Sequence, residues 1–294
     1  MIGPSEQRAF YSENGYLIAE DLLTDAEVRA LTGELTHLIR GAGRDVIGAV
    51  SDPGVSDQEV IERTLAVHHP HKLSPLVLDT VKHSRVIEVL ERLIGPDLKA
   101  MQSMLFVKKA GKPGQAWHQD EFFIATRDRS LCGVWIALDD ATIENGCLWV
   151  HPGSHKTGVL YRMEPHADDR FDTADEAVEF PYEREGGIPV ELTAGSAVFF
   201  NGYTLHRSLP NRSQGRFRRA LVTHYMSAHS LLPWSQGAPL APVDVRDIVM
   251  VAGEDPYAWK GIKPASLPYV RPENKVDAAA VYSQLQAERT RLQD

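Results

Sequence analysis

The sequence predicts a mainly β fold with flanking helices, in which a barrel or a double-sheet jelly roll forms the core. From about residue 97 onward the chain consists of short β-like runs separated by Gly, Pro and Asn, which is the pattern of all-β barrels and sandwiches. Before that point apolar residues recur at three- and four-residue spacing, which is the period of helices. We therefore expect one domain over 1–294, with a helical part at 1–96, a β core at 97–229 and a C-terminal segment at 230–294 that wraps around the core.

The N-terminal part begins with a predicted helix, a short strand and a second helix. Ser5 and the polar residues after it suit the start of a helix that ends near Asn14-Gly15. Residues 15–19 form an apolar run of strand length. Thr24-Asp25 caps a longer helix whose apolar face is spaced by three and four residues, as seen in Val28, Leu31, Leu35 and Leu38.

The remainder of the helical part contains a loop and two more helices. Residues 42–74 are rich in Gly, Asp and Pro and are expected to form an irregular loop. Two helical stretches are expected at about 75–82 and 84–94, and Gly95-Pro96 ends the second of them.

The β core is predicted to contain eight short strands. They are expected at 98–108, 116–124, 131–138, 147–150, 189–192, 197–200, 203–208 and 217–226. The stretch 162–187 is too charged for a core and is expected to be an insertion between strands. In the C-terminal segment, a polar helix is expected from about Asp277 to Gln293.

The composition excludes several classes of protein. Hydrophobic residues make up 43% and charged residues 24%, which is ordinary for a globular chain and too apolar for a disordered one. The 40 acidic and 31 basic residues give a net charge of −9, which argues against a nucleic-acid partner. No apolar run is long enough to span a membrane, and the N-terminus lacks the pattern of a signal peptide, so a cytoplasmic location is expected. The two cysteines form neither a disulfide framework nor a zinc pattern.

The tripeptide His118-Gln119-Asp120 is the most informative motif of the chain. In a strand, residues two apart point to the same face, so His118 and Asp120 would present an imidazole and a carboxylate side by side while Gln119 points away. A third donor is available downstream, because His206 lies in a strand-like run. Two histidines and one carboxylate form the facial triad that holds iron(II) with open positions.

Three arginines follow the last histidine of this set, at the head of the last core strand. They are Arg216, Arg218 and Arg219. An arginine beside a metal site can bind a distal carboxylate through two parallel hydrogen bonds. Such a pair of features would form a site for a 2-oxo acid that binds iron at one end and an arginine at the other.

These motifs, taken in order, resemble those of the phytanoyl-CoA dioxygenase family of iron(II)/2-oxoglutarate-dependent oxygenases. The resemblance covers most of the chain. Its residues are FYSENGYLIAEDLLTDAEVRAL near the N-terminus, WHQD at the metal motif, the run GVWIALDDATIENGCLWVHPGSHK, and HRSLPNRSQGRFRRALVTHY at the end of the core. The resemblance implies a double-stranded β-helix, a cupin-like jelly roll, and an enzyme that uses iron(II), 2-oxoglutarate and O₂.

The resemblance also implies roles for particular residues. It places iron on His118, Asp120 and His206. It places the distal 2-oxoglutarate carboxylate on Ser208 and on an arginine that usually lies 11 residues after the second histidine. Here that position is Phe217, so the segment carries one extra residue and the arginine-basic-alanine pattern selects Arg218, with Arg216 and Arg219 as rivals. Trp135 and Gln102 are implied to line the cofactor pocket.

The expected function is oxidation of an unactivated C–H bond of a small molecule, by hydroxylation, coupled to conversion of 2-oxoglutarate to succinate and CO₂. A setting in secondary metabolism is favoured, and the oligomeric state stays open. Because Asp120 supplies the carboxylate, oxygenation is expected rather than halogenation. Desaturation, cyclisation or epimerisation by the same cofactors is an alternative, as are a cupin-like metalloenzyme without 2-oxoglutarate and a non-catalytic jelly-roll binding protein.

Other histidines receive simpler interpretations. The run 68–71, His-His-Pro-His, has the composition of a metal site, but we interpret it as a loop near the mouth of the pocket, because the triad is complete without it. His224 lies on the last core strand and is interpreted as structural. Ordinary roles, as core or surface groups, remain open for Trp135, Ser208 and Gln102.

Overall fold

The computed structural model describes residues 3–172, 175–230, 248–262 and 266–291, and its core consists of two antiparallel sheets that face each other. In the larger sheet the order is β1 (Tyr16–Ala19), β10 (Ala197–Asn201), β5 (Cys132–Ala137), β12 (Arg218–Ser227), β3 (Leu98–Lys108), β2 (Thr64–His68) and β14 (Tyr269–Pro272), with β13 (Val249–Ala252) also paired to β3. In the smaller sheet the order is β4 (Gln115–His118), β11 (His206–Ser208), β6 (Leu148–Val150) and β9 (Ile188–Val190). Neither sheet closes into a barrel. The predicted mainly β class with flanking helices is confirmed.

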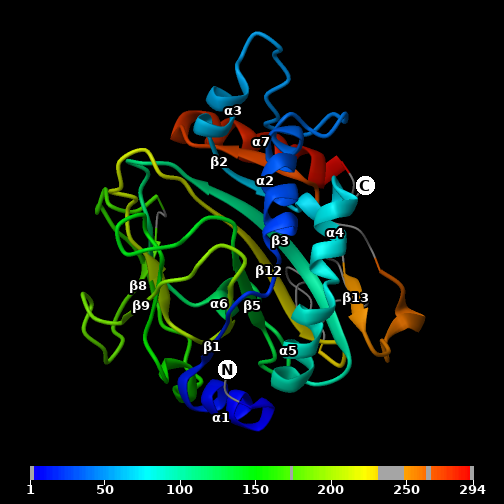
Figure 1. Cartoon of the computed structure of the whole chain (residues 1–294), viewed down its shortest axis with the longest axis vertical. Coiled ribbons are helices and arrows are strands. Elements are labelled where there is room, and N and C mark those ends of the chain that lie inside the picture. The colour runs from blue at the N-terminus through cyan, green and yellow to red at the C-terminus, as the bar shows by residue number, and fades with distance from the viewer. Residues whose placement is uncertain (1–2, 173–174, 231–247, 263–265, 292–294) are drawn as a thin grey trace.

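Helices cover the outer face of the larger sheet. In Figure 1, α2 (Asp25–Ile39), α4 (Pro75–Val81) and α5 (Ser84–Ile94) lie over β3 and β12, with α1 (Pro4–Asn14) at the end of the sheet near β1. Thr24 caps α2 by accepting a hydrogen bond from the backbone N–H of Glu27, whose side chain reaches back to the Thr24 N–H. The sheet contributes alternate residues to this helical core, and the residues between them face the smaller sheet. The inner face of the large sheet is thereby free to line a site.

The loop predicted at 42–74 contains regular structure, and that prediction is wrong over its second half. The helix α3 (Asp57–Arg63) is followed at once by β2, which pairs with β3. The glycines and the proline before residue 55 suggested a loop for the whole stretch, although residues 65–67, Leu-Ala-Val, form a short apolar run that is buried. The turn η1 (Pro70–Lys72) completes the connection to α4.

Two predicted core strands are shorter in the structure. The strand expected at 116–124 ends at His118, and Asp120 begins the short helix α6 (Asp120–Phe123). The strand expected at 203–208 begins at His206. The insertion 162–187 carries a two-stranded pair, β7 (Met163–Pro165) and β8 (Asp175–Ala177), which follows the turn η2 (Ser154–Thr157) along the chain.

The C-terminal segment joins the larger sheet. The strand β14 pairs with β2, and the predicted polar helix is α7 (Lys275–Arg291), whose expected last two residues lie outside the described part of the chain. Figure 1 shows α7 above β2, with η3 (Ala258–Lys260) in the preceding connection. Tyr269 packs with Val281 and Leu285, which fixes β14 against α7. Across the described ranges, no helix is both long and apolar enough to cross a membrane.

Candidate active site

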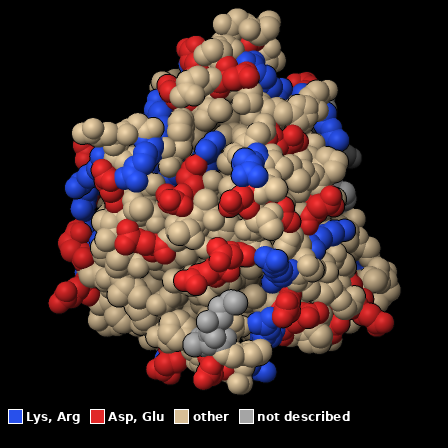
Figure 2. Space-filling model, in the orientation of Figure 1, with Lys and Arg blue, Asp and Glu red and all other residues tan. Residues whose placement is uncertain are grey.

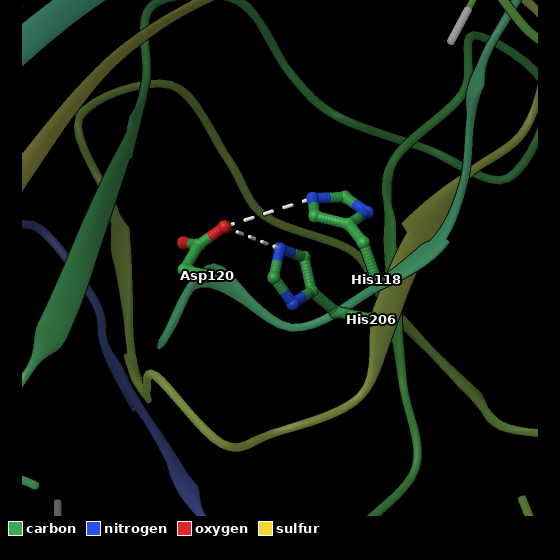
Figure 3. A group of neighbouring side chains, drawn as sticks. All are labelled: His118, Asp120 and His206. Carbon is green, nitrogen blue, oxygen red and sulfur yellow. Dashed lines mark ion pairs between the residues drawn. The ribbon is translucent and has the colours of Figure 1, made fainter. Parts of the chain in front are cut away.

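His118, Asp120 and His206 meet between the two sheets (Figure 3). His118 ends β4 and His206 begins β11, and the antiparallel register places these two residues directly opposite each other. The Oδ1 atom of Asp120 lies 3.7 Å from Nε2 of His118 and 3.6 Å from Nε2 of His206. Within the described residues, this is the group of donors whose ligand atoms are close enough to hold a metal ion.

Each imidazole of this group is held in one tautomer. The Nδ1 atom of His118 donates to the carbonyl of Ala116 at 2.7 Å, and Nδ1 of His206 donates to the carbonyl of Thr204 at 2.9 Å. A hydrogen on Nδ1 leaves the lone pair of Nε2 free to bind a metal. Burial, together with the neighbouring His118, lowers the pKa of His206 to about 4, so that this imidazole is neutral at pH 7.

Hydrogen bonds of Gln119 keep His118 and Asp120 close to each other, although β4 ends at His118. Its buried side-chain amide donates to the carbonyls of Val159 at 2.9 Å and Tyr203 at 2.8 Å, and accepts from the N–H of Tyr161 at 2.8 Å. These bonds hold the chain where it leaves β4. The prediction that Gln119 points away from the metal donors agrees with the structure, but the strand geometry used to derive it does not hold beyond His118.

Asp120 is oriented by a histidine that the sequence interpretation left as structural. Nε2 of His224 lies 2.7 Å from Oδ2 of Asp120, so that Oδ1 remains for the metal. On its other side, Nδ1 of His224 lies 3.2 Å from Nε2 of Gln102, its direct partner in the pairing of β12 with β3. Burial raises the pKa of Asp120, but the surrounding imidazoles, led by His206 and His224, hold it well below its usual range. A carboxylate that is ionised at neutral pH is the state that binds a metal.

Of the three candidate arginines, Arg218 is the one that lines the cavity between the sheets. It is 4% exposed, and its Nε atom is buried without a hydrogen-bond partner. Its guanidinium carbon lies 5.3 Å from the centre of the Trp135 ring, and burial lowers its pKa to about 10. The two rivals are occupied elsewhere, because Arg216 pairs with Glu144 and Arg219 binds Asp139 through two hydrogen bonds of 2.8 and 2.6 Å.

One cavity of about 330 Å³ contains both sets of groups. His118, Asp120, His206 and His224 line it, together with Arg218, Ser208, Trp135 and Gln102, whereas the rival arginines Arg216 and Arg219 are not among its lining residues. Two imidazoles and one carboxylate suit iron(II), and a buried guanidinium that lacks an anion suits a carboxylate. The residues present therefore fit iron and a 2-oxo acid.

The family model for phytanoyl-CoA dioxygenase (PhyH) matches residues 11–220 of this chain. The chain belongs to the phytanoyl-CoA dioxygenase family. Among curated relatives, a phytanoyl-CoA dioxygenase of Arabidopsis thaliana is 27% identical over 259 residues, which cover 76% of this chain and 88% of the relative. Phytanoyl-CoA dioxygenase 1 of Oryza sativa is 29% identical over 261 residues, covering 79% and 91%.

Solved structures with the same fold agree with this assignment. The non-heme monooxygenase ThoJ has a TM-score of 0.66 and 23% identity, covering 97% of this chain and 96% of that protein. The carbocyclase SnoK from nogalamycin biosynthesis has a TM-score of 0.61 and 25% identity, covering 80% and 93%. Membership in the phytanoyl-CoA dioxygenase family confirms the predicted enzyme class, a non-haem iron dioxygenase that uses 2-oxoglutarate, and with it the predicted cofactors.

Lys108 is a residue of the site that the family resemblance did not indicate. Its ammonium group donates to Oγ of Ser208 at 3.0 Å and to the carbonyl of Leu209 at 2.8 Å. Burial, and secondly the charge of Arg218, hold the pKa of Lys108 well below its usual range. Lys108 lies directly opposite Arg218 in the pairing of β3 with β12, and this register is a property of the structure that the sequence alone does not reveal.

Proposed function

We propose that this protein is an iron(II)- and 2-oxoglutarate-dependent dioxygenase that hydroxylates a C–H bond of a small organic molecule, with iron bound by His118, Asp120 and His206. The observation that carries the proposal is the buried, unpartnered guanidinium of Arg218 in the same cavity as these three donors. Bound iron(II) would supply the O₂-dependent oxidation of substrate, coupled to conversion of 2-oxoglutarate to succinate and CO₂.

His118, His206 and Asp120 would supply three ligand atoms to the metal, and each of these side chains is oriented by a hydrogen bond. Both ligand imidazoles present Nε2, because a backbone carbonyl holds each Nδ1–H. His224 binds one carboxylate oxygen of Asp120 and leaves the other for the metal, and Gln102 holds His224 in turn. Partners of this kind orient ligands and raise metal affinity. We therefore assign Gln102 to positioning rather than to contact with 2-oxoglutarate.

Arg218 and Ser208 would bind the distal carboxylate of 2-oxoglutarate. A guanidinium offers two parallel N–H groups to a carboxylate, and Trp135 lies against the guanidinium of Arg218 and limits its movement. The Oγ atom of Ser208 already accepts from Lys108 and from the backbone N–H of Gln115 at 3.2 Å. Its own hydrogen is therefore left to donate to the carboxylate, and the ammonium of Lys108 adds positive charge behind it.

Apolar side chains surround the remaining cavity. Met104, Phe106, Val222, Leu148 and Phe200 line it between the metal donors and Arg218. Such a wall lowers the local dielectric and strengthens the interactions of the charged groups. We propose that the reaction is a hydroxylation and that the substrate belongs to specialised metabolism. Similar structures include the epimerase SnoN, at 20% identity and a TM-score of 0.59 over 81% of this chain and 92% of that protein, so the fold accommodates other outcomes.

The test is formation of succinate from 2-oxoglutarate in the presence of iron(II), ascorbate and O₂, together with the iron content of the protein. The wild type is expected to bind one iron and to form succinate slowly without substrate. His206→Ala is expected to lose iron, and Arg218→Gln is expected to keep iron but to lose 2-oxoglutarate binding. Arg216→Gln, which alters an exposed ion pair, serves as the matched control and should behave as the wild type. Unchanged iron content in His206→Ala would refute the assignment of the metal site.

A further inference from the structure

The strands β2 and β14 carry none of the residues proposed to bind the metal or 2-oxoglutarate, but both contribute a side chain to the wall of the cavity. His68 on β2 and Arg271 on β14 both line it, and β14 lies beyond residue 220, where the family match ends. In the register of β14 with β2, Tyr269 is opposite His68, so Arg271 and His68 are diagonal neighbours on one face of the sheet. His68 lies inside the range that the family model matches, whereas Arg271 lies beyond it.

Polar atoms of this pair are left without partners. The Nε atom of Arg271 and the Nε2 atom of His68 are both buried without a hydrogen-bond partner. The Nε atom of Arg218 is in the same state. Burial, and secondly the charge of Arg271, lower the pKa of His68 to about 3, so its imidazole is neutral and carries one N–H. The ring of His68 is stacked on Tyr269 at 4.2 Å, which holds it in the wall.

The ion pair with Asp172 leaves part of the hydrogen-bonding capacity of the Arg271 guanidinium unused. A single contact of 3.3 Å joins Nη2 of Arg271 to Oδ2 of Asp172, and the Oδ1 atom of Asp172 is buried without a partner. The pair Arg219 and Asp139 shows what a completed bidentate arrangement looks like in the same protein, with both carboxylate oxygens bound. Arg271 and Asp172 are partly buried, and the buried Nε and Oδ1 atoms of this incomplete pair leave hydrogen-bonding capacity for a ligand.

The surroundings of Arg271 indicate the rest of the ligand. Met104 and Phe106 of β3 lie between β12, which carries His224, and β2 with β14. Three strand spacings separate β12 from β14, which is about 14 Å. Phe123 is half exposed and lines the same cavity, as does the exposed residue Asp175. A ligand that reaches from the metal to Arg271 therefore crosses an apolar surface.

We propose that Arg271 and His68 form a subsite for a carboxylate of the substrate, which is an apolar molecule with a carboxylate remote from the oxidised carbon. This inference rests on the proposed function for the position of the reacting carbon, but the carboxylate subsite itself can be measured separately. The guanidinium of Arg271 binds the carboxylate through Nε and an Nη atom, and the neutral His68 donates from Nε2. Asp172 competes with the substrate for Arg271.

The test is calorimetric binding of octanoate, with octan-1-ol as the uncharged control of equal chain length. The protein is loaded with zinc and saturating 2-oxoglutarate, so that Arg218 is occupied and no oxidation takes place. The wild type is expected to bind octanoate at least about tenfold more tightly than octanol, the effect of one charge-assisted hydrogen bond. Arg271→Gln should bring octanoate to the level of octanol, and Arg216→Gln should change nothing.

Asp172→Asn separates a ligand subsite from a structural role. Because it removes the competing carboxylate, it should bind octanoate severalfold more tightly than the wild type, whereas a merely structural ion pair predicts no gain. Octanoate binding no tighter than that of octanol, or unchanged by Arg271→Gln, would overturn the proposal. Failure of the proposed function is visible separately, as absent 2-oxoglutarate binding by the wild type, whereas Arg271→Gln is expected to bind 2-oxoglutarate normally.

Discussion

Replacing Arg218 by Met should stabilise the protein without its cofactors and abolish its response to 2-oxoglutarate. Burial lowers the pKa of Arg218 from its usual 12.5 to about 10. At 1.36 kcal/mol for each pKa unit, this difference of 2.5 corresponds to about 3 kcal/mol of penalty for keeping the charge in the folded state. Because the folded-state pKa is the lower one, the penalty is fully present at pH 7 and fades only above about pH 10. Methionine fills similar space without a charge, so Arg218→Met should raise the free energy of unfolding by about 1–3 kcal/mol.

Thermal and urea unfolding measure this change directly. A gain of about 1–3 kcal/mol corresponds to a rise in Tm of about 2–6 °C for a chain of this size. In the presence of zinc and 2-oxoglutarate at about 100 times its Kd, the wild type should gain about 2.7 kcal/mol, and Arg218→Met should gain much less. The variant would then be more stable than the wild type without 2-oxoglutarate and lose that advantage with it.

Arg219→Met is the matched control, since it removes the neighbouring arginine of the same strand. Arg219 is bound to Asp139 through two short hydrogen bonds, so its loss should destabilise the protein by about 1 kcal/mol with or without 2-oxoglutarate. The reasoning is refuted if Arg218→Met is destabilised in the cofactor-free protein, or if 2-oxoglutarate stabilises it as much as the wild type.

Two further outcomes are expected. His224→Ala should weaken iron binding about 10–100-fold, because Asp120 loses the group that orients it; competition with a chelator measures this change. His224→Gln keeps an N–H donor and should recover part of the affinity. Equal iron affinities in the wild type and both variants would contradict this role of His224. The thiols of Cys132 and Cys147, whose pKa values burial raises to about 12, should not react with a thiol reagent at pH 8 in the native protein and should both react after denaturation; rapid labelling of the native protein would disagree with this burial.

Most strands of the two core sheets, and the candidate group formed by His118, Asp120 and His206, could be predicted from the sequence because they depend on recognisable patterns. The strands β2, β13 and β14 of the larger sheet were not predicted. Apolar runs bounded by turn residues identify strands, and the motif around His118 carries its own chemistry. The early end of β4 was not predicted, because the bonds that cause it join Gln119 to Val159, Tyr161 and Tyr203, which are 40 or more residues away. Local strand geometry has no access to such partners.

The supporting residues were missed for a related reason. His224 and Lys108 act through residues that strand order and register bring beside them, and a single sequence does not reveal which strands are neighbours. The same is true of Arg271, whose strand pairs with β2 about 200 residues earlier in the chain. The acidic net charge predicted nothing about the cavity. On the face seen in Figure 2, acidic and basic side chains are interspersed. The cationic groups proposed to act in the site, Lys108 and Arg218, are buried.

The strand β12 links the two ends of the candidate active site. His224, Val222, Ala220 and Arg218 alternate along its inner face, so one strand carries the residue that positions Asp120 and the residue proposed to bind 2-oxoglutarate. A shift of one residue within the strand would turn all of them outward. The extra residue that the family resemblance implies would leave the facing of β12 unchanged if it lies before the strand, in the turn where the Asn211 amide donates to the carbonyl of Arg216 at 2.7 Å.

Phe217 occupies the position where the family pattern expects the arginine, and it packs against the helical core on the outer face of the sheet. An arginine at this position would therefore point away from the cavity, toward apolar side chains. Because β12 begins at the next residue, the inward-facing position falls on Arg218. The spacing from His206 can thus change by one residue while the face of the strand stays the same, and the facing of the side chain, rather than its distance along the sequence, identifies the arginine.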